Sequence, residues 1–226
     1  MEYIQKNIVE VRERIISAAQ KAGRDPKSVK LIAVSKTFPA EAVQSAYGAE
    51  QRLFGENKVQ DLALKNAALP KDIEWHMIGH LQSNKAKLAV ENADYIHAVD
   101  SVKLLKKIDR LAGELGYSPK VLLEINVSGE ESKFGANSEL VKELAQTASQ
   151  CGNITIAGLM TMAPFGVPED ELRFVFSSLR KLRDSLQTKF ELDLPELSMG
   201  MSGDFEIAIE EGATMVRVGT SIFGRR

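Results

Sequence analysis

The sequence predicts one α/β domain over residues 1–226, a (β/α)8 TIM barrel with one extra helix at its N-terminus. The first observation behind this prediction is the alternation of eight short apolar runs with helix-like stretches. The second is their spacing, about 25 residues per strand–helix unit, at the small end for this barrel. The third is that no Gly-, Ser- or Pro-rich linker or internal repeat divides the chain. A doubly wound open sheet competes, but no GxGxxG motif follows the first strand, so a dinucleotide-binding version has no support.

The composition favours a cytoplasmic globular protein. Hydrophobic residues make up 44% and charged residues 27% of the chain, and the net charge is −2, which excludes disorder as the main state. No apolar run is long enough to span a bilayer, and the N-terminus is too charged for a secretory signal. The near-neutral charge argues against nucleic-acid binding. The lone cysteine excludes an internal disulfide, and with three histidines a structural zinc site is not expected.

An amphipathic helix opens the chain. Its apolar residues recur at steps of four and three, which places them on one face: Ile4, Ile8, Val11, Ile15, Ala18 and Ala22. Gly23 and Pro26 end this helix. The eight strands follow as apolar runs that need not alternate, because parallel strands are buried on both faces. They span 31–35, 52–55, 75–79, 95–99, 121–127, 155–160, 196–199 and 215–218.

Helices with recognisable ends lie between these strands. They are predicted over 39–48, 101–116, 137–152, 168–190 and 204–212. Ser101 is the predicted cap of the second, and Gly116 ends it. The third begins at Asn137 or Ser138, and Pro168 followed by three acidic residues begins the fourth.

The active site of such a barrel lies where the strands end and the following loops begin. Lys36 comes directly after the first strand, in AVSKT. Partial desolvation at this position would lower the pKa of the lysine and make it a nucleophilic amine. Most lysines are surface charges, and that interpretation stays open for Lys36 when its position is considered alone.

The loops after the seventh and eighth strands carry glycines and hydroxyls. They read MGMSGD at 199–204 and RVGTS at 217–221. Glycines allow close backbone approach, while Ser202 and Thr220 can donate hydrogen bonds. Either loop alone is explained equally well as a tight turn. Both together, after strands seven and eight, favour a phosphate site.

Other polar residues give weaker signals. His76 and His80 are four apart but lack the glutamate of an HExxH zinc motif. His80 and Gln82 could face the pocket from the third loop. Asn57 could offer its amide to a ring substituent, and Glu56 could be a charge at a helix start. No GxSxG or Walker motif is present, which excludes serine hydrolase and P-loop chemistry.

A lysine amine opposite a phosphate cradle fits pyridoxal 5'-phosphate. The aldehyde of this cofactor would form a Schiff base with Lys36, and its phosphate would lie at Ser202, Gly219 and Thr220.

Six motifs together resemble the YggS/PROSC family, the pyridoxal phosphate homeostasis proteins. They are AVSK at 33–36, FGEN at 54–57, HMIGHLQSNK at 76–85, GLMTM at 158–162, LSMGMSGD at 197–204 and VRVGTSIFG at 216–224. The resemblance implies a fold-type III pyridoxal phosphate protein, a monomer similar to the barrel domain of alanine racemase. It implies cofactor contacts from Lys36, Asn57, Met199, Gly200, Ser202, Arg217, Gly219 and Thr220, with Arg217 near the pyridine nitrogen. The implied role is to hold the cofactor and keep vitamin B6 pools balanced, without an established reaction.

The sequence also favours a carrier over an enzyme. Racemisation needs an acid/base group on each face of the substrate, and alanine racemases supply the second as a tyrosine from another domain. The chain ends after the eighth unit, and its tyrosines Tyr3, Tyr47, Tyr95 and Tyr117 fall away from the C-terminal ends of the strands. Arginine donates to a ring nitrogen without readily protonating it, which weakens the ring as an electron sink. A non-catalytic carrier that delivers cofactor to apo enzymes is therefore predicted, with a racemase or lyase, or another phosphate-binding barrel enzyme, as alternatives.

Overall fold

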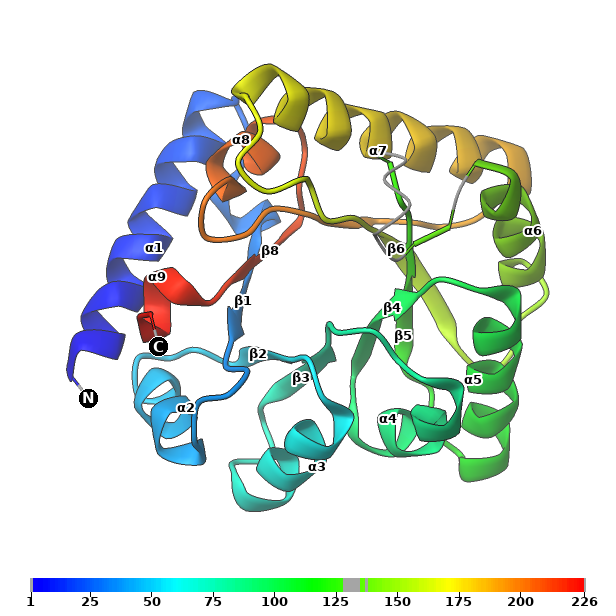
Figure 1. The fold of residues 1–226 in the computed structure, drawn as a ribbon, viewed down its shortest axis with the longest axis horizontal. Helices are drawn as coiled ribbons and strands as arrows, with labels where there is room; N and C mark the ends of the chain where they lie inside the picture. The colour runs from blue at the N-terminus through cyan, green and yellow to red at the C-terminus, as the bar shows by residue number, and fades with distance from the viewer. Residues whose placement is uncertain (1, 128–134, 137, 226) are drawn as a thin grey trace.

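Eight parallel strands close into a barrel in the order in which they occur along the chain. The computed structural model describes residues 2–127, 135–136 and 138–225. The strands are β1 (Lys30–Val34), β2 (Leu53–Glu56), β3 (Glu74–Met77), β4 (Tyr95–Val99), β5 (Lys120–Glu124), β6 (Thr155–Met160), β7 (Glu196–Ser198) and β8 (Met215–Val218). The strand β1 pairs with both β2 and β8, which completes the ring (Figure 1). The predicted (β/α)8 barrel is therefore confirmed.

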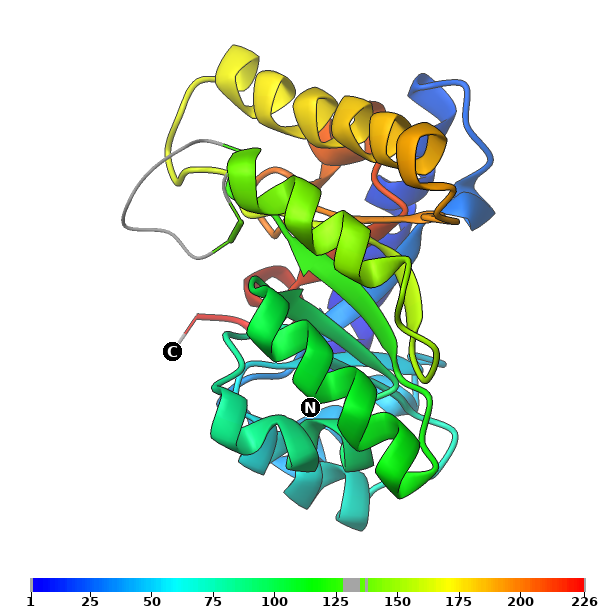
Figure 2. The same cartoon turned by 90° about the vertical axis from the view of Figure 1, so that its right-hand side faces the viewer.

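The helices surround the strands. They are α1 (Glu2–Lys21), α2 (Ala40–Tyr47), α3 (Val59–Ala68), α4 (Ala86–Asn92), α5 (Val102–Leu115), α6 (Ser138–Ala148), α7 (Glu169–Phe190), α8 (Phe205–Glu210) and α9 (Thr220–Phe223). In Figure 2, the green to orange helices α5, α6 and α7 lie outside the strands. The extra helix α1 packs against α2, α8 and α9. None of the helices in the described residues is long and apolar enough to cross a membrane.

Both predicted ends of the 101–116 helix are confirmed by their capping geometry. Ser101 accepts a hydrogen bond from the backbone N–H of Leu104, and Gly116 adopts the left-handed conformation with φ 71°. The predicted 137–152 helix ends earlier, at Ala148, and a start at Asn137 lies outside the described residues. The helices α3 and α4 were not delimited from the sequence, and neither begins with a side-chain cap that a pattern could reveal.

Two corrections concern element boundaries. The strand predicted over 121–127 ends its ladder at Glu124, because Ile125 instead forms an isolated bridge to Ala136. Ala22, predicted on the buried face of the first helix, lies beyond the end of α1 and is only half-buried. Gly23 follows with φ 66°, the left-handed conformation that ends the helix.

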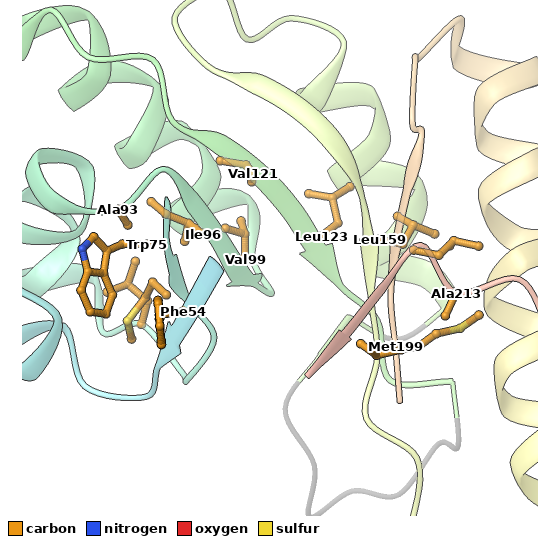
Figure 3. Close-up of a cluster of buried hydrophobic side chains, with 14 of the residues drawn as sticks. Phe54, Trp75, Ala93, Ile96, Val99, Val121, Leu123, Leu159, Met199 and Ala213 are labelled. Atoms are coloured by element: carbon orange, nitrogen blue, oxygen red, sulfur yellow. The ribbon is translucent and has the colours of Figure 1, made fainter. Parts of the chain in front are cut away.

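The apolar core has two layers, one on each side of the barrel wall. The larger lies between strands and helices, and Figure 3 shows part of it, including Phe54, Trp75 and Met199. The smaller fills the barrel interior and consists of Ile32, Tyr95, Ala98, Leu122, Ala157, Met160 and Met215. Fully buried polar side chains on β3 and β4, His76 and His97, are present as well. The interior is thus partly polar.

Candidate functional site

A cavity of about 660 Å³ opens at the C-terminal ends of the strands. Its volume is in the range of sites for small organic ligands. Five residues singled out from the sequence line it: Lys36, Ser202, Arg217, Gly219 and Thr220. Apolar residues that were not singled out complete the lining, among them Val34, Phe38, Ile78, Met162 and Leu172. The end of the barrel chosen from fold principles therefore gathers five of the eight predicted cofactor-binding residues.

Lys36 stands at the rim, just past the end of β1. Its side chain is exposed, which corrects the expectation that it is desolvated. No ion-pair or hydrogen-bond partner for its amine occurs in the described part of the chain. The next residue, Thr37, has φ 67°, a left-handed conformation that is strained for a β-branched residue. A strained turn thus follows a lysine that is exposed at the mouth of the cavity.

A buried polar network lies behind Lys36. The Ser35 hydroxyl donates to Glu56 Oε1 at 2.7 Å. Lys65, reaching in from α3, forms an ion pair with the same carboxylate and donates to the Ser35 carbonyl at 3.0 Å. Glu56 is fully buried and Lys65 nearly so. Glu56 is therefore not a charge at a helix start, as one interpretation had it, but an anchor for the backbone that precedes Lys36.

The two glycine-containing loops meet in space. The Ser202 hydroxyl accepts from the backbone N–H of Gly219 at 3.2 Å and of Ser221 at 3.4 Å. The backbone N–H groups of Ser202, Gly203 and Thr220 have no acceptor among the hydrogen bonds of the described residues. Unengaged N–H groups beside several hydroxyls form a donor set that suits the oxygens of a phosphate.

Gly219 lets the second loop lie close to the first strand. A Cβ atom at this position would be 3.3 Å from the Val34 carbonyl oxygen, tighter than most such contacts. A Cβ at Gly203, in contrast, would meet nothing within 4 Å. The close approach to β1 thus favours glycine at position 219, whereas position 203 has room for a side chain.

Three residues that the resemblance implied for cofactor contact do not line the cavity. Met199 is fully buried in the layer between strands and helices. A Cβ at Gly200, which has φ 92°, would be 2.6 Å from the Ala208 Cβ, so this glycine permits the turn to pack on α8. Asn57 is exposed at the end of β2. A Cβ on Gly79 would be only 2.3 Å from the Asn57 carbonyl oxygen, so the two backbones pack closely. Their geometry gives these residues packing roles around the site.

His80 and Gln82, considered for the third loop, are exposed and lie outside the cavity lining. His80 Nδ1 is instead 3.5 Å from the carboxylate of Asp100. Among the described residues, no group of three or more His, Cys, Asp or Glu could hold a metal ion.

Arg217 reaches the cavity from inside the barrel. Only 5% of it is exposed. Its Nη1 donates to the Ser198 hydroxyl at 2.6 Å and its Nη2 to the Thr161 carbonyl at 2.9 Å. Burial lowers the pKa of Arg217 to about 10, while Glu124 and Asp204 act in the opposite direction. The guanidinium is therefore charged at neutral pH and fixed by two acceptors.

Two buried side chains near Arg217, those of His97 and Glu124, were not identified as site residues from the sequence. His97 Nδ1 lies 3.0 Å from the Ser198 hydroxyl, which also accepts from Arg217. Glu124, at the end of β5, has its pKa raised to about 7, first by burial and then by Asp100. A signal for His97 did exist: it lies two residues after Tyr95 on one strand, and alternate residues share a face.

A family model confirms the relationship that the motifs suggested. The model described as alanine racemase, N-terminal domain, matches residues 7–226. A pyridoxal phosphate homeostasis protein of Aquifex aeolicus is 44% identical, with 96% of this chain and 95% of the relative covered. The protein of the same name from Escherichia coli strain K12 is 39% identical, with 100% of this chain and 98% of the relative covered.

Solved structures with similar folds include relatives and more distant enzymes. PipY of Synechococcus elongatus, with PLP bound, superimposes with a TM-score of 0.87 and is 43% identical, covering 98% of this chain and 100% of that one. Alanine racemase from Streptomyces coelicolor has a TM-score of 0.78 at 17% identity and covers all of this chain but 58% of the racemase. The second likeness shows a common barrel fold.

Proposed function

The chain belongs to the family of pyridoxal phosphate homeostasis proteins, and we propose that it binds pyridoxal 5'-phosphate and serves in the homeostasis of this cofactor. The domain that does so is the barrel over residues 1–226. One observation carries the proposal: a single cavity brings together Lys36, the unengaged donors of the two glycine loops, and the guanidinium of Arg217. Holding the cofactor without a dedicated reaction, acting as a monomer in the cytoplasm, and direct transfer to apo enzymes are parts of the same proposal.

Each part of the cofactor has a matching group in the cavity. The Lys36 amine would condense with the aldehyde to a Schiff base, with loss of one water. Ser202, Gly219 and Thr220 would bind the phosphate through hydroxyl and backbone N–H groups. Arg217 would donate to the pyridine nitrogen. When bound, the cofactor supplies an electrophilic carbon and an electron-withdrawing ring.

Asn57, Met199 and Gly200 complete the proposed set as supporting residues. Gly200 accepts a backbone hydrogen bond from Arg217 at 3.0 Å, and Met199 donates one to Met215 at 3.1 Å. They would act on the cofactor by fixing the backbone of its loops.

The arrangement of acid/base groups supports a carrier. Tyr3 and Tyr47 lie on helices, Tyr95 begins β4, and Tyr117 lies between α5 and β5. None of the four is at the C-terminal end of a strand in the described structure. Arg217 can donate a hydrogen bond but cannot accept one. This pairing of one amine with a donor-only arginine favours storage of the cofactor over turnover of a substrate.

A pyridoxal phosphate-dependent racemase or lyase is the second candidate function. The observation that favours it is Glu124, a buried carboxyl whose raised pKa of about 7 suits an acid/base group. Glu124 is absent from the residues that line the cavity, however, which makes this candidate the weaker one.

Delivery of the cofactor separates the two candidates. Protein loaded with pyridoxal phosphate and freed of excess cofactor is mixed with the apo form of a pyridoxal phosphate enzyme. We expect the activity of that enzyme to return, and we expect no turnover of amino acids by the loaded protein alone. The absorption spectrum before and after borohydride reduction, with peptide mapping, identifies the attached lysine.

Steady, stereospecific turnover of one amino acid at about 1–10³ per second would overturn the carrier proposal. A protein that shows no cofactor band after incubation with pyridoxal phosphate would contradict cofactor binding itself.

A further inference from the structure

A chain of hydrogen bonds crosses the interior of the barrel from Arg217 toward the opposite end. The Ser198 hydroxyl, which accepts from Arg217 at 2.6 Å, lies 3.0 Å from His97 Nδ1. His97 Nε2 lies 2.9 Å from His76 Nδ1, and His76 Nε2 lies 3.0 Å from Glu74 Oε1. The five residues come from β8, β7, β4 and β3, so the chain joins opposite walls of the barrel. It begins at the cavity and ends at the first residue of β3.

The two ends of this chain fix the direction of every bond in it. Arg217 can only donate, so the Ser198 oxygen accepts from it. Glu74 can only accept as a carboxylate, and the hydrogen bond from His76 lowers the pKa of Glu74 despite its partial burial. His76 must then carry its proton on Nε2 and accept at Nδ1, and the same holds for His97. The Ser198 hydroxyl completes the series by donating to His97.

Burial supports this single arrangement. Ser198, His76 and His97 are fully buried. Burial lowers the pKa of both imidazoles, that of His97 most strongly, with His76 and Arg217 adding to the effect on His97. Both rings are therefore neutral at neutral pH. The Tyr95 ring stacks on His76 with a centroid distance of 4.7 Å and an interplanar angle of 10°, which holds the imidazole plane.

We propose that Ser198, His97, His76 and Glu74 are positioning residues that orient the Arg217 guanidinium toward the ring of the bound cofactor. The inference rests on the proposed function, because it names residues that serve the same site from behind. Aligned hydrogen bonds polarise one another, and the carboxylate at the far end complements the guanidinium at the near end. Arg217 is then pre-organised as a donor before the cofactor arrives, and no cost of ordering it remains to be met on binding.

The tautomers of the two histidines test the chain without cofactor. In ¹⁵N-labelled protein, two-bond proton–nitrogen correlations distinguish Nδ1–H from Nε2–H rings. His80, which is not part of the hydrogen-bonded series, is the reference. We expect His76 and His97 to be neutral with the proton on Nε2. A proton on Nδ1 of either ring, or a charged ring at neutral pH, would overturn the proposal.

Variants then connect the chain to the cofactor. His97→Leu and Ser198→Ala should weaken pyridoxal phosphate binding about tenfold and shift the visible band of the bound cofactor. Ser198→Ala is nearly isosteric and keeps the test valid if His97→Leu does not fold. The matched control is Gln51→Leu, a buried polar residue whose amide donates to the carbonyls of Leu31 and Leu53 instead. It should leave affinity and spectrum unchanged.

Wild-type affinity and spectrum in Ser198→Ala would refute the positioning role, as would equal losses in Gln51→Leu. Failure of the proposed function looks different, because the wild-type protein would then not bind pyridoxal phosphate at all. Even then, the tautomers of the two histidines can be measured and support or refute the hydrogen-bonded series. The order parameter of Arg217 Nε–H, compared between wild type and Ser198→Ala, does the same.

Discussion

Two cationic side chains face one cavity but are held in opposite ways. Lys36 is exposed at the rim, and its amine contacts no partner in the described residues. Arg217 is 5% exposed and donates to the oxygens of Ser198 and Thr161. The residues next to these two side chains show the opposite contrast. The backbone before Lys36 is anchored by a buried ion pair, whereas Arg217 is connected through Ser198 to neutral histidines.

The proposed function accounts for this difference. An amine that forms and releases a covalent bond to a cofactor needs room to move, so only its backbone is fixed. A donor that meets a ring nitrogen gains from a fixed direction, because pre-organised dipoles need no reorganisation. The following predictions break or sharpen this contrast, beginning with the largest effect.

Replacement of the exposed amine should give an all-or-none result. Lys36→Ala leaves no amine at the end of β1, so the Schiff-base absorption band should vanish and borohydride should label no peptide from this loop. The barrel should remain folded, because Lys36 is exposed. Lys58→Ala, another exposed lysine that follows a strand, is the control and should keep the band. A band that persists in Lys36→Ala, or a label on another lysine, would refute the assignment.

Breaking the ion pair behind Lys36 should mainly reduce stability. Lys65→Met leaves Glu56 buried without its cation, which should lower the free energy of unfolding by about 3–5 kcal/mol. Urea unfolding followed by circular dichroism measures the loss. In the double variant Glu56→Gln, Lys65→Met, most of the stability should return, since no unpaired charge remains.

Lys87→Met, at an exposed ion pair with Glu91, serves as the control and should change stability little. If Lys65→Met is as harmless as Lys87→Met, the network does not anchor this loop.

The phosphate loops should contribute graded affinity. Ser202→Ala or Thr220→Ala removes one hydrogen bond to a charged group, worth about 1.5–3 kcal/mol or roughly 10–100-fold in affinity. Titration of the apo protein with pyridoxal phosphate measures the change, and Thr188→Val on α7 is the control. Pyridoxal without phosphate should bind weakly to all these proteins. Equal affinity of the wild type for the two ligands would place the phosphate elsewhere.

The smallest effect concerns pH and the carboxyl beside Arg217. The pKa of Glu124 rises from 4.5 to about 7 on folding, so the folded state holds an extra proton between these values. The free energy of unfolding should therefore fall as pH rises through this window. The shift allows at most about 3 kcal/mol, and relaxation around the charged form reduces this to on the order of 1 kcal/mol.

Urea midpoints across the window measure the slope, which Glu124→Gln should reduce. The exposed Glu114→Gln is the control and should retain it. A slope that is the same in Glu124→Gln and in the wild type would show that another group titrates.

The local sequence was sufficient to predict the barrel and much of its cavity. Hydrophobic runs marked the eight strands, and Ser101 and Gly116 marked helix ends, because these signals depend on neighbouring residues alone. Lys36, Ser202 and Thr220 could be placed at the cavity since every strand of such a barrel ends at the same face. By itself, then, the sequence determined the fold, the end that carries the site, and the residue types that point to the cofactor.

Only the tertiary structure decided how each of these residues is held. The His97–Ser198 contact joins positions 101 apart in sequence, and its distance depends on the register at which the barrel closes. The pairing of Glu56 with Lys65, the exposure of Lys36 and the burial of Met199 likewise depend on packing between elements. Local patterns specify the direction of a strand and its faces, but contacts across the barrel arise when all strands pack together. That closure gives Arg217 two fixed acceptors and leaves Lys36 exposed at the rim.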